Sequence, residues 1–176
     1  IFTLIVVTFA VIILQSDSLQ NYQIDRLLVF IDEEADSGAR YNLEQAQVAI
    51  GNGGLTGKGL FEGTQNNSDL VPEQQNDFIF TVIAEETGFI GSMVVLGLLA
   101  LLLIRIWRIS QIADDKFGSL IAAGVFSMLL FQIFQSVGMA VGIMPITGIP
   151  LPLISHGGSS VISTFIAIGL VQSVHM

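Results

Sequence analysis

Acidic side chains surround the start of a long apolar stretch, where a carboxylate can act as a general base. Asp77 directly precedes Phe78–Phe80, Glu73 lies one helical turn upstream, and Glu85 and Glu86 lie inside the stretch. A region of low dielectric disfavours ionisation of a carboxylate and so makes it a stronger base. An ionisable group inside a membrane span is also a candidate functional residue. Alternatively, these acids could cap the N-terminus of a helix and interact favourably with its dipole. The spacing leaves both interpretations open.

A glycine-rich run, Gly51–Gly63, lies upstream of these acids and holds six glycines in thirteen residues. It fits neither common phosphate-binding template, because Lys58 is not followed by Ser or Thr and a dinucleotide fingerprint would need glycine in place of Glu62. Glycines nevertheless let backbone N–H groups approach an anion closely, and Lys58 is the only cation between Arg40 and Arg105. The alternative is a loop that needs glycine only for positive φ angles.

Other chemical groups are few. The chain has no cysteine, and His156 and His175 are too far apart for the usual zinc spacings. His156 precedes Gly157-Gly-Ser-Ser160, but no Gly-x-Ser-x-Gly elbow is present. This turn is therefore expected to cap a helix rather than to hold a nucleophile.

The composition separates an acidic segment from apolar ones. The chain has 176 residues, a formal charge of −9, 12% charged residues and a mean hydropathy of +0.74, which exclude a disordered or soluble acidic protein. The negative charge also argues against a nucleic-acid binder, which needs clustered Lys and Arg. Eleven of the fifteen acidic residues fall between Asp17 and Asp77.

Four apolar segments are expected to form membrane helices or parts of them, over residues 1–14, 78–104, 118–143 and 158–176. The first would span only roughly 21 Å, short of a hydrocarbon core of roughly 30 Å, so we expect it to be the end of a truncated helix. Residues 144–157 contain three prolines, which forbid a regular helix. This segment is predicted to be irregular and re-entrant, covered by protein rather than by lipid.

The basic residues orient these segments. Residues 105–117 carry Arg105, Arg108 and Lys116 and are therefore expected to form a cytoplasmic loop. The large acidic loop over residues 15–77 then lies outside the cell, together with the Pro-rich segment.

The acidic loop itself shows two helical patterns. Apolar residues repeat with helical spacing from Ile24 to Ile31, which predicts a short amphipathic helix on the membrane surface. A second short helix is predicted from Leu43 to Ile50, ending at Gly51 as a C-terminal cap.

Five sequence motifs follow one another along the chain. They are Gly57-Lys-Gly59, Gly63-Thr-Gln65, Val71-Pro-Glu-Gln-Gln-Asn-Asp-Phe-Ile-Phe80, Ala84-Glu-Glu-Thr-Gly-Phe-Ile-Gly91 and Met144-Pro-Ile-Thr-Gly-Ile-Pro-Leu-Pro-Leu-Ile-Ser-His-Gly-Gly-Ser-Ser160. From about Tyr22 to the C-terminus, the sequence resembles the SEDS family (shape, elongation, division and sporulation) of RodA, FtsW and SpoVE. The first two motifs are more similar to the RodA branch. His156 departs from the family, which usually has Tyr there.

The resemblance implies an all-α polytopic membrane protein. The chain would be the C-terminal part of a bundle of roughly ten helices, with a large extracytoplasmic loop that contains short amphipathic helices. The family lies in the bacterial inner membrane and polymerises lipid II into β-1,4-linked glycan strands of peptidoglycan, releasing undecaprenyl pyrophosphate. Its essential aspartate lies in a Pro-Glu-x-x-x-Asp-Phe motif, which corresponds to Asp77.

These family properties imply a role for each site residue. Asp77 would deprotonate the 4-hydroxyl of the acceptor sugar, which attacks the anomeric carbon of the donor with inversion. Cationic groups or a divalent cation, Mg or Mn, would stabilise the anionic leaving group, with Asp77 and Glu73 as candidate metal ligands. The candidate substrate-binding residues are Arg26, Arg40, Lys58, Thr64, Gln65 and Glu73.

The resemblance also implies protein partners, namely a class B penicillin-binding protein and other membrane proteins of the elongasome or divisome. Two other function classes stay open on the residues alone. Glutamines and glutamates in spans, with a broken Pro-rich segment, are also typical of a transporter, here a lipid II flippase. The third class is a non-catalytic scaffold. Formation of polymer from lipid II would distinguish a glycosyltransferase from a flippase and from a scaffold.

Overall fold

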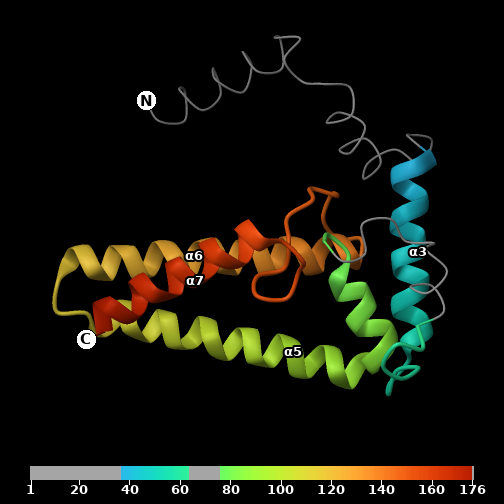
Figure 1. The fold of residues 1–176 in the computed structure, drawn as a ribbon, viewed down its shortest axis with the longest axis horizontal. Coiled ribbons are helices and arrows are strands. Elements are labelled where there is room, and N and C mark those ends of the chain that lie inside the picture. The colour runs from blue at the N-terminus through green and yellow to red at the C-terminus, as the bar shows by residue number, and fades with distance from the viewer. Residues whose placement is uncertain (1–36, 64–75, 176) are drawn as a thin grey trace, which may run out of the picture.

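The computed structural model describes residues 37–63 and 76–175, and the secondary structure in these two ranges is helical, without strands. The helices are α3 (Ser37–Gly53), α5 (Ile79–Ile112), α6 (Lys116–Ala140) and α7 (Gly158–His175), shown in Figure 1. The predicted all-α class is confirmed for this part of the chain. The apolar segment 1–14 and the amphipathic helix predicted over residues 24–31 lie outside the described residues.

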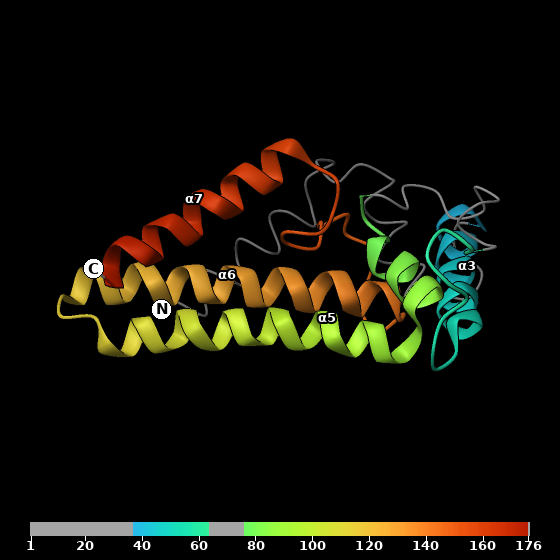
Figure 2. The ribbon, with the colours of Figure 1, turned by 60° about the horizontal axis from the view of Figure 1, so that its bottom comes forward.

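Helices α5 and α6 form an antiparallel pair that makes up the long axis of the molecule (Figure 2). Both are long enough and apolar enough to cross a membrane, judged by length and composition. Large apolar side chains such as Leu98, Leu101 and Phe131 remain exposed along them. Such a surface is expected of helices that face lipid or further apolar helices.

The connection between α5 and α6 is shorter than the predicted loop over residues 105–117. Helix α5 continues to Ile112, and α6 begins at Lys116. The prediction of the loop was wrong in its bounds because hydropathy marks the apolar part of a helix, whereas backbone hydrogen bonding continues through the polar residues beyond it. Asp115 begins α6 as its N-cap, since its carboxylate accepts hydrogen bonds from Phe117 N–H (2.9 Å) and Gly118 N–H (3.1 Å).

Replacing Asp115 by Ala is expected to destabilise the full-length protein by about 0.5–2 kcal/mol, because two N–H groups of α6 lose their acceptor. Thermal unfolding in detergent measures this change. Asp114→Ala is the matched control, because Asp114 is exposed and lies outside the cap. Equal unfolding temperatures for the two variants would contradict a capping role.

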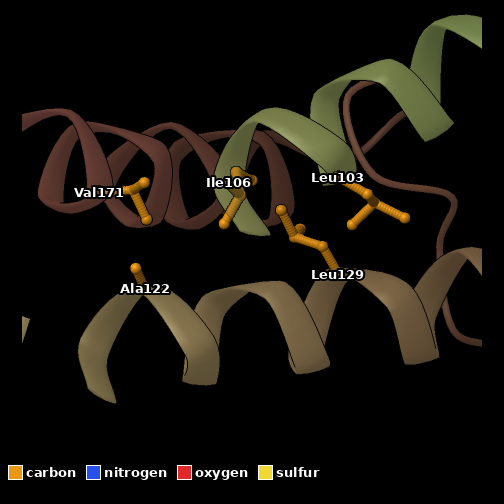
Figure 3. Close-up of a cluster of buried hydrophobic side chains, with 5 residues drawn as sticks. All are labelled: Leu103, Ile106, Ala122, Leu129 and Val171. Atoms are coloured by element: carbon orange, nitrogen blue, oxygen red, sulfur yellow. The ribbon is translucent and has the colours of Figure 1, made fainter. Parts of the chain in front are cut away.

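Helix α7 lies obliquely across the α5–α6 pair and meets it near the α5–α6 connection (Figure 2). A cluster of buried apolar side chains joins the three helices, with Leu103 and Ile106 from α5, Ala122 and Leu129 from α6, and Val171 from α7 (Figure 3). The α5–α6 connection and α3 lie at opposite ends of the α5–α6 pair (Figure 1).

Helix α3 is longer than predicted. It runs from Ser37 to Gly53, so it begins before Leu43 and passes through Gly51, which was predicted to end it. Among the residues that the structure describes, Gly54 is the first with positive φ, at 55°. Ala46 and Ala49 are fully buried, and the helix packs against α5. Tertiary packing of this small-residue face outweighs the weak helix propensity of Gly51.

The Pro-rich segment between α6 and α7 is irregular, as predicted, and is stabilised by a hydrogen bond to α6 and by one within the segment. Gln135 of α6 is buried and donates from Nε2 to the carbonyl oxygen of Pro145 at 2.9 Å. The Ser155 hydroxyl accepts a hydrogen bond from Leu151 N–H at 2.8 Å, and Leu151 is fully buried. The segment therefore has a defined path that brings Leu151 into the core.

Replacing Gln135 by Leu is expected to destabilise the full-length protein by about 1–3 kcal/mol, because the Pro145 carbonyl loses its donor. A lower unfolding temperature in detergent would show this loss. Gln132→Leu serves as the control, because Gln132 lies in the same helix and is only half-buried. If both variants unfold at the same temperature, Gln135 does not hold the Pro-rich segment.

Candidate functional site

Asp77 is half-buried in the turn that leads into α5. Both aromatic residues that follow it are buried. Phe78 lies in a cluster with Ala46 of α3 and Ile146 of the Pro-rich segment, while Phe80 lies in a cluster that includes Ala140 and Leu151. Three separate parts of the chain therefore hold the backbone next to this carboxylate.

The first turns of α5 point in a different direction from the rest of the helix, as Figure 1 shows. The bend lies at Gly88, whose backbone angles (φ 70°, ψ −166°) are not helical. The segment predicted as a membrane helix over residues 78–104 is therefore helical from Ile79 and bent at Gly88. Asp77 precedes the short segment, residues 79–87, and its position depends on the bend.

The glycine-rich loop after α3 packs its backbone onto this bend. The carbonyl oxygens of Glu85 and Glu86 accept hydrogen bonds from Lys58 N–H and Gly59 N–H, both at 3.1 Å. In the other direction, Phe89 N–H donates to the Gly54 carbonyl at 2.9 Å and Ile90 N–H to the Leu55 carbonyl at 3.1 Å. Four main-chain hydrogen bonds thus join residues 54–59 to residues 85–90.

Glycine is required at this contact because the two backbones touch. Gly57 and Gly88 both have positive φ, at 79° and 70°. A Cβ atom at Gly57 would collide with the carbonyl group of Glu86, and one at Gly88 would collide with the backbone of Gly57 and Leu55. Within the glycine run, the interpretation as a loop that needs positive φ is confirmed at Gly57.

Three consecutive N–H groups of this loop already donate to carbonyl oxygens of the protein. Gly57 N–H donates to the Gly53 carbonyl at 2.8 Å, and the N–H groups of Lys58 and Gly59 donate to α5. The hypothesis that N–H groups of the glycine run bind an anion is therefore wrong for these three groups. The reason is that the broken helix supplies carbonyl oxygens that need donors and lie at contact distance.

The side chain of Lys58 lies against the same helix segment. Its Nζ is 3.3 Å from Oε1 of Glu85, whose side chain is fully buried, while 29% of the Lys58 side chain is exposed. A buried carboxylate needs a cation or strong donors beside it, and Lys58 supplies the charge. Lys58 thus contacts Glu85 with both its backbone N–H and its ammonium group.

Of the other predicted site residues, one lies on α3 and the rest lie outside the described ranges. Arg40 is on α3, where its guanidinium pairs with Glu44 of the same helix at 2.8 Å on a solvent-accessible face. Arg26, Thr64, Gln65 and Glu73 lie outside the described residues.

A cavity of about 590 Å³ lies beside the start of α5. Ile79, the second residue after Asp77, lines this cavity together with Ser155, His156, Gly157 and the start of α7. His156 is exposed at this cavity. The Pro-rich segment and Asp77 are therefore brought to the same end of the bundle.

No group of three His, Cys, Asp or Glu residues in the described part of the chain could hold a metal ion. The second predicted ligand, Glu73, lies outside that part. The described residues therefore do not by themselves form a metal site around Asp77.

The whole chain, residues 1–176, matches the family model described as the cell cycle protein family of FtsW, RodA and SpoVE. Over 158 residues, 89% of the chain, it is 42% identical to the peptidoglycan glycosyltransferase MrdB of Escherichia coli K12 and 44% identical to the peptidoglycan glycosyltransferase RodA of Treponema pallidum. It is 40% identical to stage V sporulation protein E of Bacillus subtilis over 154 residues. These alignments cover 43%, 36% and 42% of the relatives, so the chain spans less than half of their length.

Solved structures agree with this relationship. A structure described as showing the coordination of polymerization and crosslinking by a peptidoglycan synthase complex matches 98% of this chain, and 48% of its own, at 34% identity and a TM-score of 0.73. A mutant of the rod shape determining protein RodA from Thermus thermophilus matches 58% of this chain, and 35% of its own, at 43% identity and a TM-score of 0.55. Sequence and fold together show that this chain belongs to the FtsW, RodA and SpoVE family.

Proposed function

We propose that this chain is the C-terminal part of a peptidoglycan glycosyltransferase that polymerises lipid II into β-1,4-linked glycan strands. The observation that carries this proposal is the identity of 42–44% to two proteins named peptidoglycan glycosyltransferase, over 89% of the chain. The similarity to a peptidoglycan synthase complex supports it. Nothing comparable favours a flippase or a scaffold.

Asp77 is the proposed general base. Its carboxylate takes the proton from the 4-hydroxyl of the acceptor sugar while that oxygen forms a bond to the anomeric carbon of the donor. The bond from the same carbon to the pyrophosphate oxygen breaks, so undecaprenyl pyrophosphate leaves with the electron pair and the configuration inverts. The packing of Phe78 and Phe80 supports this role, because a base must be held in a fixed position to act.

The cavity lined by Ile79 offers space for a sugar at the start of α5, and Ile79 is the second residue after Asp77. The proposed substrate contacts are five of the residues expected from the sequence: Arg26, Arg40, Thr64, Gln65 and Glu73. Arg40 is suited to an anionic headgroup at the surface, because its side chain is partly exposed on α3. A divalent cation stays a proposal, and no step of the mechanism above is assigned to it.

We further propose the location and partners of the full-length protein. The apolar helices α5 and α6 support a membrane location, and we place the protein in the bacterial inner membrane as a multi-pass bundle of roughly ten helices, with Asp77 on the outer side. The match to a complex of polymerization and crosslinking supports a class B penicillin-binding protein as partner, within the elongasome or divisome.

Purified full-length protein in liposomes with labelled lipid II tests the proposed function. We expect glycan strands and release of undecaprenyl pyrophosphate. Movement of lipid II across the bilayer without polymer would support the flippase instead. Neither movement nor polymer, with or without the penicillin-binding protein, would support a scaffold.

A further inference from the structure

The bend in α5 removes two consecutive hydrogen bonds of the helix, and one loop replaces both of them. In a regular helix, Phe89 N–H would donate to the Glu85 carbonyl and Ile90 N–H to the Glu86 carbonyl, four residues back. Here both N–H groups donate to the loop, at Gly54 and Leu55. The two carbonyls accept from Lys58 and Gly59 of the same loop. We call residues 54–59 the splint.

The splint stabilises the bent form of α5 by supplying hydrogen-bond partners for four backbone groups at the bend. A break in a helix that exposes backbone groups inside an apolar bundle is costly unless the groups find other partners. Because the splint satisfies all four groups at 2.9–3.1 Å, the bend persists only while the splint stays in place. If the splint moved away, the helix would be expected to recover its own hydrogen bonds and straighten.

Lys58 is the residue that ties the splint to the bend through its side chain as well as its backbone. Its N–H contacts the Glu85 carbonyl, and its ammonium group contacts the Glu85 carboxylate at 3.3 Å. Glu85 is fully buried, whereas the Lys58 side chain keeps 29% of its surface exposed. Removing the ammonium group takes a cation away from a buried carboxylate, which is more damaging than taking the carboxylate away from a partly exposed ammonium group.

We propose that Lys58, through Glu85 and the bend at Gly88, is a positioning residue for Asp77 and not a contact for the anionic leaving group. Asp77 precedes the short segment, residues 79–87, whose direction the bend sets. The inference rests on the proposed function, since it assigns Lys58 a task in the reaction of Asp77. Lys58 belongs to the splint, whereas Glu85 and Gly88 belong to the bent part of α5.

A double-mutant cycle in the full-length protein tests this inference, with polymerisation of lipid II as one readout. We expect Lys58→Met to lower the rate by about 100-fold, the effect of displacing a reacting group by about 1 Å. Glu85→Gln is expected to lower it less. The double variant, which carries neither charge, is expected to recover to the rate of Glu85→Gln. Glu62→Gln, an exposed acid in the same loop, is the control with the wild-type rate.

Hydrogen exchange measured by mass spectrometry is the second readout and does not depend on activity. Peptides that cover residues 54–59 and 85–90 are expected to exchange at least about tenfold faster in Lys58→Met than in wild type, and to regain protection in the double variant. If Lys58→Met does not fold, recovery of folded protein in the double variant is the corresponding expected result.

Two results would overturn the inference. A loss of polymerisation in Lys58→Met that persists in the double variant, with unchanged exchange, would show that Lys58 acts on the substrate. Unchanged exchange together with unchanged activity would show that the pair does not hold the splint. If wild-type protein makes no polymer, the proposed function fails, and the exchange data alone still decide whether the Lys58–Glu85 pair holds the bend.

Discussion

Full-length protein carrying Asp77→Asn is expected to polymerise lipid II about 10²–10⁴ times more slowly than wild type, the usual contribution of a positioned general base. Asn keeps the size of the side chain and its place in the turn before α5, but it cannot take a proton from the acceptor hydroxyl. We therefore expect kcat to fall while KM and the unfolding temperature change little. Gel analysis of labelled glycan strands at several lipid II concentrations measures these values.

The matched control for this variant is Asp114→Asn. Asp114 is an exposed carboxylate in the connection between α5 and α6, at the far end of the helix from Asp77. Its replacement is expected to leave polymerisation unchanged. A large loss in both variants would point to a general effect of charge, and wild-type rates in both would remove Asp77 from the mechanism.

Gly88→Ala is the second substitution expected to lower polymerisation strongly, because it changes the residue at which α5 bends. Alanine at a positive φ with an extended ψ, as at Gly88, costs about 1–3 kcal/mol through backbone strain. In addition, its Cβ would collide with the backbone of Gly57 and Leu55, and backbone cannot move aside as a side-chain tip can. We expect a lower unfolding temperature, loss of protection from hydrogen exchange in the splint, and polymerisation reduced by about 100-fold as Asp77 is displaced.

Gly97→Ala separates the bend from a general effect of replacing glycine in α5. Gly97 lies nine residues further along the same helix, and a Cβ there would meet no atom within 4 Å. Alanine is the better helix former, so this variant is expected to be as stable as wild type or more stable. If Gly88→Ala behaves like Gly97→Ala in all three measurements, the bend does not position Asp77.

The helices could be predicted from the sequence because their signals are local. Apolar stretches set the centres of α5 and α6, and prolines set the irregular segment after α6. The ends were less accurate. Ile112 ends α5 well after the apolar stretch, and Gly51 does not end α3, because hydrogen bonding and packing continue where hydropathy and propensity change.

The candidate site could be predicted only in part, for a physical reason. Asp77 stood out because an acid at the border of an apolar stretch is a local feature. The splint depends on backbone contacts between residues about 30 positions apart, which no local pattern encodes. One signal was present: Gly88 follows two acids inside an apolar stretch, and the glycine run upstream contains Lys58, a cation that can pair with Glu85.

The most direct test of the central claim is the single-turnover rate of glycosidic bond formation, measured in the full-length protein with lipid II already bound. This experiment removes substrate binding and product release from the rate. Wild-type protein is expected to form the bond and release undecaprenyl pyrophosphate in step, and Asp77→Asn to do so at least about 100 times more slowly. Equal single-turnover rates for the two proteins would contradict the assignment of Asp77 as the base.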